Sequence, residues 1–147
     1  MLKKLVLATV LAVAPVTVVH ACDVSYMSTS EAVHKAMKRG WGFKDYEAIC
    51  RKLNAANAAL QISADTTVLG GVSIAWVSVS LKDKNLDVFA PDFGGVATST
   101  NSTPSMSVAQ DILPQTISDA VNSIDLDRAI ASLNTNRKKV RAAYQKK

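Results

Sequence analysis

Two cysteines are the residues of this sequence most able to do covalent chemistry. Cys22 and Cys50 are the only thiols, and three uses are open to them. They can form one disulfide, closing a loop of 29 residues counting both ends, a constraint that contributes on the order of 3.5 kcal/mol. Cys50 could instead be a nucleophile with His34 as its base, although no third residue to orient the histidine is evident. Cys22 could also carry a lipid if the chain were cleaved immediately before it.

The first 21 residues help to decide between these uses. A short basic segment, Met1-Leu2-Lys3-Lys4, precedes an uncharged, largely apolar run over residues 5–19 and a small residue at Ala21. This order is typical of a secretory signal peptide, here over residues 1–21. Pro15 interrupts the apolar run, which is shorter than the ~20 residues that span a bilayer. We therefore expect a bacterial protein that is exported to the periplasm or secreted.

Export favours the disulfide over the other two uses, because exported thiols meet an oxidising compartment. The lipid anchor remains as an alternative, which would make the chain an outer-membrane lipoprotein through Cys22. His20, however, is bulky and polar where a small residue normally precedes an acylated cysteine. We expect a Cys22–Cys50 bridge that ties the mature N-terminus to the helix carrying Cys50.

Metal-ligating residues occur in one suggestive pattern, which is incomplete. Asp83, Asn85 and Asp87 alternate as the first three ligands of an EF-hand loop do. The sixth position should be glycine and is Val88, and the twelfth should be glutamate and is Gly94. The chain also lacks a Gly-x-Ser-x-Gly elbow and a phosphate-binding glycine loop. We predict no metal, no cofactor and no catalytic residue, and hence a protein that is not an enzyme.

The candidate binding residues are basic or aromatic. Arg137, Lys138, Lys139 and Arg141 could attract a membrane surface or an acidic protein. Cations that complement the dipole of a solvated helix end are the favoured interpretation, because the formal charge falls from +5 to +3 once the two lysines of the leader are removed. Trp41, between two predicted helices, is either a corner plug or an exposed anchor for a partner. Core packing is favoured for it.

The composition is that of one globular domain. The chain has 147 residues, of which 48% are hydrophobic and 20% charged. These values are near the globular average and exclude a disordered polar chain. Residues 22–147 are enough for a single α+β domain that buries about two thirds of its unfolded surface.

Hydrophobic periodicity predicts two helices in the first part of this domain and strands in the middle. The first helix is expected over residues 28–39, with Ser28-Thr29-Ser30-Glu31 as a capping box. The second is expected from Asp45 to about residue 60, with an apolar stripe facing the core. Strands are expected over residues 66–69, 72–81, 86–89 and 96–100, and Gly70-Gly71 can form a hairpin turn. The alternation changes phase at Val77, which suggests a bulge or a strand covered on both faces, and Trp76 is assigned to the core.

Two further helices are expected at the C-terminal end. One begins at Ser105 or Ser107 and contains Pro114, where a kink or break is expected. The other begins at Asp125. The predicted fold is α+β: an antiparallel β-meander of three to four strands flanked by two N-terminal and two C-terminal helices.

These features predict a small exported, non-enzymatic protein that binds another macromolecule in the bacterial envelope, as an accessory, inhibitor or immunity-type factor. The partner is expected to be a protein, and nucleic acid is excluded by export. One alternative is a small-ligand carrier with a pocket between the sheet and the helices, to which hydroxyls of residues 98–107 would contribute. The other is the lipid-anchored envelope component.

Overall fold

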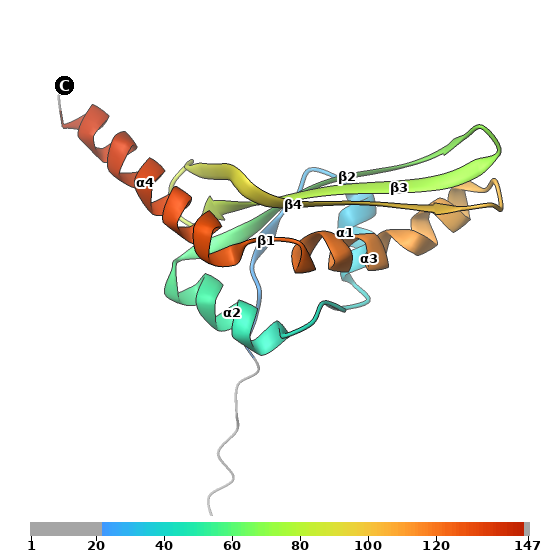
Figure 1. Cartoon of the computed structure of the whole chain (residues 1–147), viewed down its shortest axis with the longest axis horizontal. Helices are drawn as coiled ribbons and strands as arrows, with labels where there is room; N and C mark the ends of the chain where they lie inside the picture. Colours follow the sequence, from blue (N-terminus) through green and yellow to red (C-terminus); the bar gives the residue numbers. More distant parts are fainter. Residues whose placement is uncertain (1–21, 146–147) are drawn as a thin grey trace, which may run out of the picture.

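The computed structural model describes residues 22–145, so the signal peptide expected over residues 1–21 lies outside the described part. The chain forms eight elements in the order β1 (Tyr26–Met27), α1 (Glu31–Met37), α2 (Tyr46–Ala55), β2 (Ala58–Leu69), β3 (Val72–Asp83), β4 (Phe89–Asn101), α3 (Met106–Asn122) and α4 (Leu126–Tyr144). Figure 1 shows one sheet, with a long β2–β3 hairpin at one end and α4 projecting at the other.

The sheet has the strand order β1-β2-β3-β4. Strands β2, β3 and β4 form the antiparallel meander, and Gly70-Gly71 makes the β2–β3 turn with positive φ at both residues. Strand β1 pairs in parallel with β2 at Leu60 and Gln61. The α+β class is therefore confirmed, whereas the purely antiparallel meander is confirmed only in part, because β1 makes the sheet mixed.

The boundary between α2 and β2 corrects the sequence-based prediction. The helix ends at Ala55, not near residue 60, and the chain turns at Asn57, which has a φ of 49°. From Ala58 onward the chain is a strand that places Leu60 and Ile62 in the core. An alanine-rich segment favours helix by local propensity, and here tertiary packing of the alternating apolar residues prevails.

The phase change in β3 also has a different meaning from the one predicted. Every second residue from Ser73 to Asp83 is buried without interruption, so the backbone of β3 does not bulge. The register shift lies opposite Val79–Leu81, within a β4 that continues through residues 91–95 instead of ending there. Val72, Ile74 and Trp76 consequently point away from the core, and the assignment of Trp76 to the core was wrong.

Helix α3 covers one face of the sheet, called here the inner face, along β3 and β4. It approaches β4 so closely that a Cβ on Gly95 would overlap the carbonyl oxygen of Ala120 and lie 2.7 Å from the Ser123 hydroxyl. Only glycine fits there. Helix α3 also passes through Pro114 without the predicted break.

The helix starts agree with the sequence to different degrees. Ser105 precedes α3, and the Asp125 carboxylate accepts from the amide of Arg128 at the start of α4, as predicted. Helix α1 begins after Ser30 instead of Ser28, so the predicted capping box does not form.

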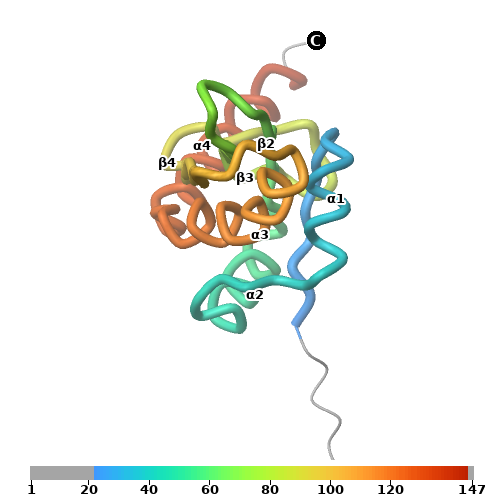
Figure 2. Tube along the Cα trace, turned by 90° about the vertical axis from the view of Figure 1, so that its right-hand side faces the viewer, coloured from blue at the N-terminus to red at the C-terminus, as the bar shows by residue number. Residues whose placement is uncertain are grey.

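The helices leave the opposite face of the sheet uncovered. Figure 2, viewed along the sheet, shows α3 and α2 below the strands, α1 at one side and α4 at the other. Apart from Ala59, the buried residues on β2 and β3 belong to the face that α3 contacts. The other face, called here the outer face, is open over the β2–β3 hairpin and the second half of β4.

Candidate functional site: the outer face of the sheet

The outer face carries an apolar patch, whereas the solvent-exposed face of an antiparallel sheet is normally polar. The side chain of Trp76 is 43% exposed and that of Val96 is 73% exposed. Ile74, Val72 and Leu69 extend the patch along the hairpin, because alternate residues of a strand share one face. We call these five residues the outer-face patch. Exposed aromatic and aliphatic residues gathered on one surface are typical of an interaction site.

The strand register fixes the neighbours of Trp76. Asp65 on β2 and Thr98 on β4 lie directly opposite it, so the three residues form one row across the sheet. Asp65 is the only charged residue among residues 63–69, 72–80 and 96–101. Its Oδ1 accepts a hydrogen bond from the amide of Thr66 at 2.8 Å, leaving its other oxygen without a partner among the described residues. A tryptophan beside a single carboxylate therefore sits in otherwise uncharged surroundings.

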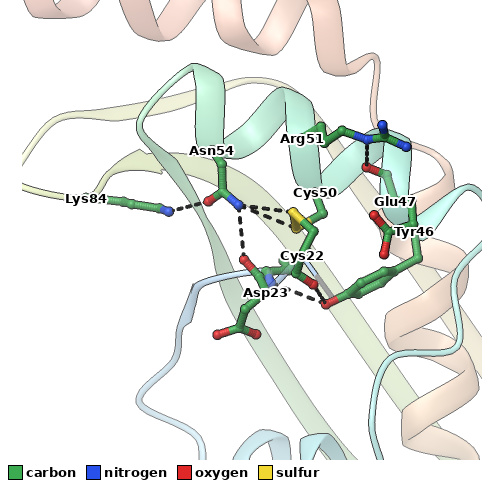
Figure 3. The surroundings of a disulfide bond; sticks show 9 residues. Cys22, Asp23, Tyr46, Glu47, Cys50, Arg51, Asn54 and Lys84 are labelled. Atoms are coloured by element: carbon green, nitrogen blue, oxygen red, sulfur yellow. Dashed lines mark hydrogen bonds between the residues drawn. A yellow bond between two sulfur atoms is a disulfide. The ribbon is translucent and has the colours of Figure 1, made fainter. Parts of the chain in front are cut away.

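The predicted disulfide between Cys22 and Cys50 is present, with Cα atoms 6.0 Å apart (Figure 3). Tyr46 donates its hydroxyl to the Cys22 carbonyl at 2.8 Å and accepts from the Val24 amide. Asn54 Nδ2 contacts the Cys22 sulfur at 3.2 Å. The disulfide and these hydrogen bonds therefore hold residues 22–24 against α2.

The bridge bears on the two competing uses of the cysteines. Cys50 is fully buried and bonded to Cys22, so it offers no thiolate for nucleophilic chemistry. His34 instead contacts the Tyr26 hydroxyl and the Ser28 carbonyl. A bridged Cys22 has no sulfur free for a thioether, so this structure lends no support to the lipid anchor.

Trp41 packs within an aromatic cluster instead of standing free. Its ring meets Tyr26 edge-on at 5.6 Å between centroids and Phe43 at 5.2 Å. Phe43 in turn lies 5.3 Å from Tyr46. Trp41 is partly buried and packs against the hydrophobic core. Edge-to-face contacts of this kind stabilise a corner, which fits the favoured interpretation of Trp41 as a plug between α1 and α2.

The structure separates the four basic residues that the sequence grouped together. Arg137 is nearly buried and donates to Asp83 at 2.6 Å and to the Asn57 carbonyl at 3.0 Å. It therefore anchors α4 to the end of the β2–β3 pair. Lys138, Lys139 and Arg141 are exposed on the projecting end of α4.

Asp83 is a buried acid whose pKa is shifted by its surroundings. Its side chain is 4% exposed, and burial acts to raise its pKa. The backbone amides of Asn85 and Leu86, the hydrogen bond from Arg137 and the charge of that guanidinium act in the opposite direction and prevail, so the pKa lies below its ordinary value. The two amide bonds close the turn over residues 83–86.

This turn accounts for the acidic pattern that opens like a calcium loop. Asp83 is committed to the two amides and to Arg137, while Asp87 is exposed and pairs with Lys82 at 2.9 Å. Among residues 22–145 there is no group of three or more His, Cys, Asp or Glu side chains arranged to hold a metal ion.

The hollows of the surface differ from the predicted carrier pocket. Beneath the sheet the space is filled by fully buried side chains such as Leu81, Leu113, Ile117 and Leu133. A hollow of about 470 Å³ lies between α2 and the α3–α4 junction, and its lining combines apolar residues with Lys44, Asp45, Lys52 and Asn122. Three hydroxyls of the 98–107 segment have partners within the chain: that of Ser99 lies 2.8 Å from the Thr116 hydroxyl, and those of Ser105 and Ser107 lie 2.8 Å from each other.

The sequence analysis missed Trp76 as a surface residue, although a signal for it was present. That signal was the phase change at Val77, since it separates apolar residues that face the core from apolar residues that face outward.

Comparison with models of protein families, with curated proteins and with solved structures gives no match, so the site rests on its own geometry. Within residues 22–145, no helix has the length and apolarity needed to cross a membrane.

The buried Asp83–Arg137 pair generates a prediction about stability. Asp83→Asn should lower the free energy of unfolding at pH 7 by about 3–5 kcal/mol, because it leaves the Arg137 charge without its partner. The folded-state pKa of Asp83 is depressed, so the wild-type advantage is fully present above the unfolded-state pKa of about 3.9. It is lost as the pH falls through the lower folded-state pKa.

Urea unfolding between pH 7 and pH 2 measures this effect. Asp87→Asn is the matched control. Asp87 lies in the same loop, and its carboxylate is exposed to solvent although it pairs with Lys82. This substitution should change stability by less than about 1 kcal/mol. Equal effects of the two substitutions at pH 7 would show that the buried pair does not hold α4.

Proposed function

We propose that this chain is a small exported protein of the bacterial envelope that binds a protein partner through the outer-face patch. The observation that carries the proposal is the exposure of Trp76 in the middle of a sheet whose other face is fully packed. A large apolar ring in the centre of an exposed surface is the residue type that dominates binding energy at interfaces.

Export is supported by the N-terminal sequence and by the chemistry of the cysteines. Residues 1–21 have the order of a signal peptide, and the disulfide begins at the first residue after the expected cut. Disulfides persist in oxidising compartments such as the periplasm and the extracellular space. A periplasmic or secreted location is therefore part of the proposal.

The charge of the surface favours a protein over an anionic partner. Residues 63–69, 72–80 and 96–101 contain one charged side chain, the acidic Asp65. Nucleic acid and anionic lipid both require a basic surface. A partner protein would instead place an apolar side chain on Ile74 and Val96. An arginine or lysine stacked on Trp76 would also be near Asp65, combining a cation–π contact with an ion pair.

Two other surfaces support weaker candidates. The hollow of about 470 Å³ beside α2 has the size of a small-ligand site, but its rim charges are partly neutralised because Lys52 pairs with Asp127 at 2.7 Å. The basic end of α4 could bring the chain to a membrane surface. The experiments below separate the basic end of α4 from the outer-face patch.

The export half of the proposal predicts a defined mass for the chain recovered from its native host. The mature protein should begin at Cys22 and weigh two hydrogens less than the reduced chain, since the bridge removes both thiol protons. Intact mass spectrometry with and without a reducing agent measures this. Retention of residues 1–21, or a diacylglycerol increment on Cys22, would contradict it.

The proposed binding surface predicts that one substitution on the outer face weakens capture of a partner. Wild-type chain immobilised on a support should retain a stoichiometric protein from an envelope extract, and Trp76→Ser should weaken that interaction tenfold or more. Leu86→Ser is the matched control, because Leu86 is an exposed apolar residue in the loop at the other end of the sheet.

The pattern of losses identifies the surface. Equal retention by wild type and Trp76→Ser would overturn the proposal, as would the absence of any stoichiometric partner. Loss on Lys139→Glu with Trp76→Ser unaffected would transfer the interaction to the basic end of α4.

A further inference from the structure

Strand β4 is an edge strand that is covered along only half of its length. Over its first half, Asn136 of α4 donates to the Phe89 carbonyl at 2.8 Å and Ser132 donates to Asp92 at 3.2 Å. This half also contains Pro91 and the register shift, both of which discourage pairing with another strand. Natural sheets protect their edges in this way.

The second half of β4 lacks all of these protections. Residues 96–101, Val-Ala-Thr-Ser-Thr-Asn, contain no charge and no proline, and three of them are β-branched. They pair regularly with β3 from Ser73 to Ser78, so this stretch contains no bulge, and as the last strand of the sheet its far side carries unpaired backbone groups. No strand or helix of the described chain pairs with that side. An uncharged, regular edge is a template for another strand.

The opposite edge of the sheet is less suited to pairing. Strand β1 occupies β2 at Leu60 and Gln61, and the exposed continuation carries Asp65 near its centre. Two β2 edges paired with each other about this point would bring the two aspartates near one another, which opposes pairing. Pairing β4 of one copy with β2 of the next would form an open-ended array instead of a closed dimer.

We infer that residues 96–100 pair in an antiparallel manner with the same residues of a second copy, forming a two-fold dimer with one continuous sheet. Centred on Thr98, this register places Val96 opposite Thr100 and Ala97 opposite Ser99 of the second copy. No like charges meet, and β-branched residues face each other on the outer side, which favours pairing. The inference goes beyond the proposed function and does not rest on it.

The dimer would join two outer-face patches into one surface. Because Trp76 lies opposite Thr98 within each copy, one row would cross the interface from Trp76 through both Thr98 residues to the second copy's Trp76. With strands about 4.8 Å apart, the two tryptophan Cα atoms would be separated by roughly 14 Å. A partner with a repeated or two-fold surface would then engage both patches at once.

Charge substitutions at the two-fold axis test the pairing. Sedimentation equilibrium of the oxidised chain over residues 22–147 should show a dimer for the wild type. Thr98→Lys and Thr98→Glu should each raise the dimer dissociation constant at least tenfold, because each puts like charges directly opposite one another. An equimolar mixture of the two variants should restore dimers, and misfolded variants could not produce that rescue.

Thr67→Lys is the matched control, since Thr67 is an exposed outer-face residue on β2, away from the β4 edge. It should leave dimerisation unchanged. A wild-type chain that remains monomeric up to about 1 mM would overturn the inference. So would dimers that persist in Thr98→Lys, a mixture that stays monomeric, or an effect of Thr67→Lys equal to that of Thr98→Lys. Because these measurements use the isolated chain, failure to capture a partner from extracts would leave their outcome unaffected.

Discussion

The close approach of α3 to β4 at Gly95 is the constraint on which the rest of the structure depends. The backbone of the helix and the backbone of the strand nearly touch there, and no side chain other than hydrogen fits between them. This contact fixes α3 against the inner face, where Leu113 and Ile117 are buried. The chain then leaves α3 at the edge of the sheet, so α4 covers the first half of β4 and none of the described helices covers the outer face. The exposure of Trp76 is therefore a consequence of how the core is packed.

A disulfide and a buried ion pair attach the two ends of the described chain to this core, and they stabilise it in different ways. The Cys22–Cys50 bridge joins the first described residues to α2 and acts mainly by restricting the unfolded chain. The pair between Asp83 and Arg137 joins α4 to the far end of the hairpin and acts in the folded state, where its charges are already out of water. Neither interaction involves a residue of the outer-face patch.

The sequence allowed the local features to be predicted and left the tertiary ones open. The Gly70-Gly71 turn and the cap at Asp125 depend on residue types at short range, and the bridge could be predicted because the sequence has only two cysteines; all three are present. The end of α2 could not be found in this way, because alanine suits a helix and only packing against β3 makes residues 58–62 a strand. Strand β1 has two residues and no pattern of its own. Within the candidate site, periodicity located Trp76 on a strand but could not tell which of two apolar faces the helices would cover.

Hydroxyl-radical footprinting of the chain, free and bound to its partner, tests the central claim most directly. Two exposed aromatic residues serve as reporters: Trp76 on the outer face and Tyr144, which is 75% exposed near the end of α4. Both should be oxidised in the free protein, and binding should protect Trp76 while Tyr144 stays as reactive as before. Protection of Tyr144 with Trp76 still oxidised would contradict the account and assign the interaction to the basic helix.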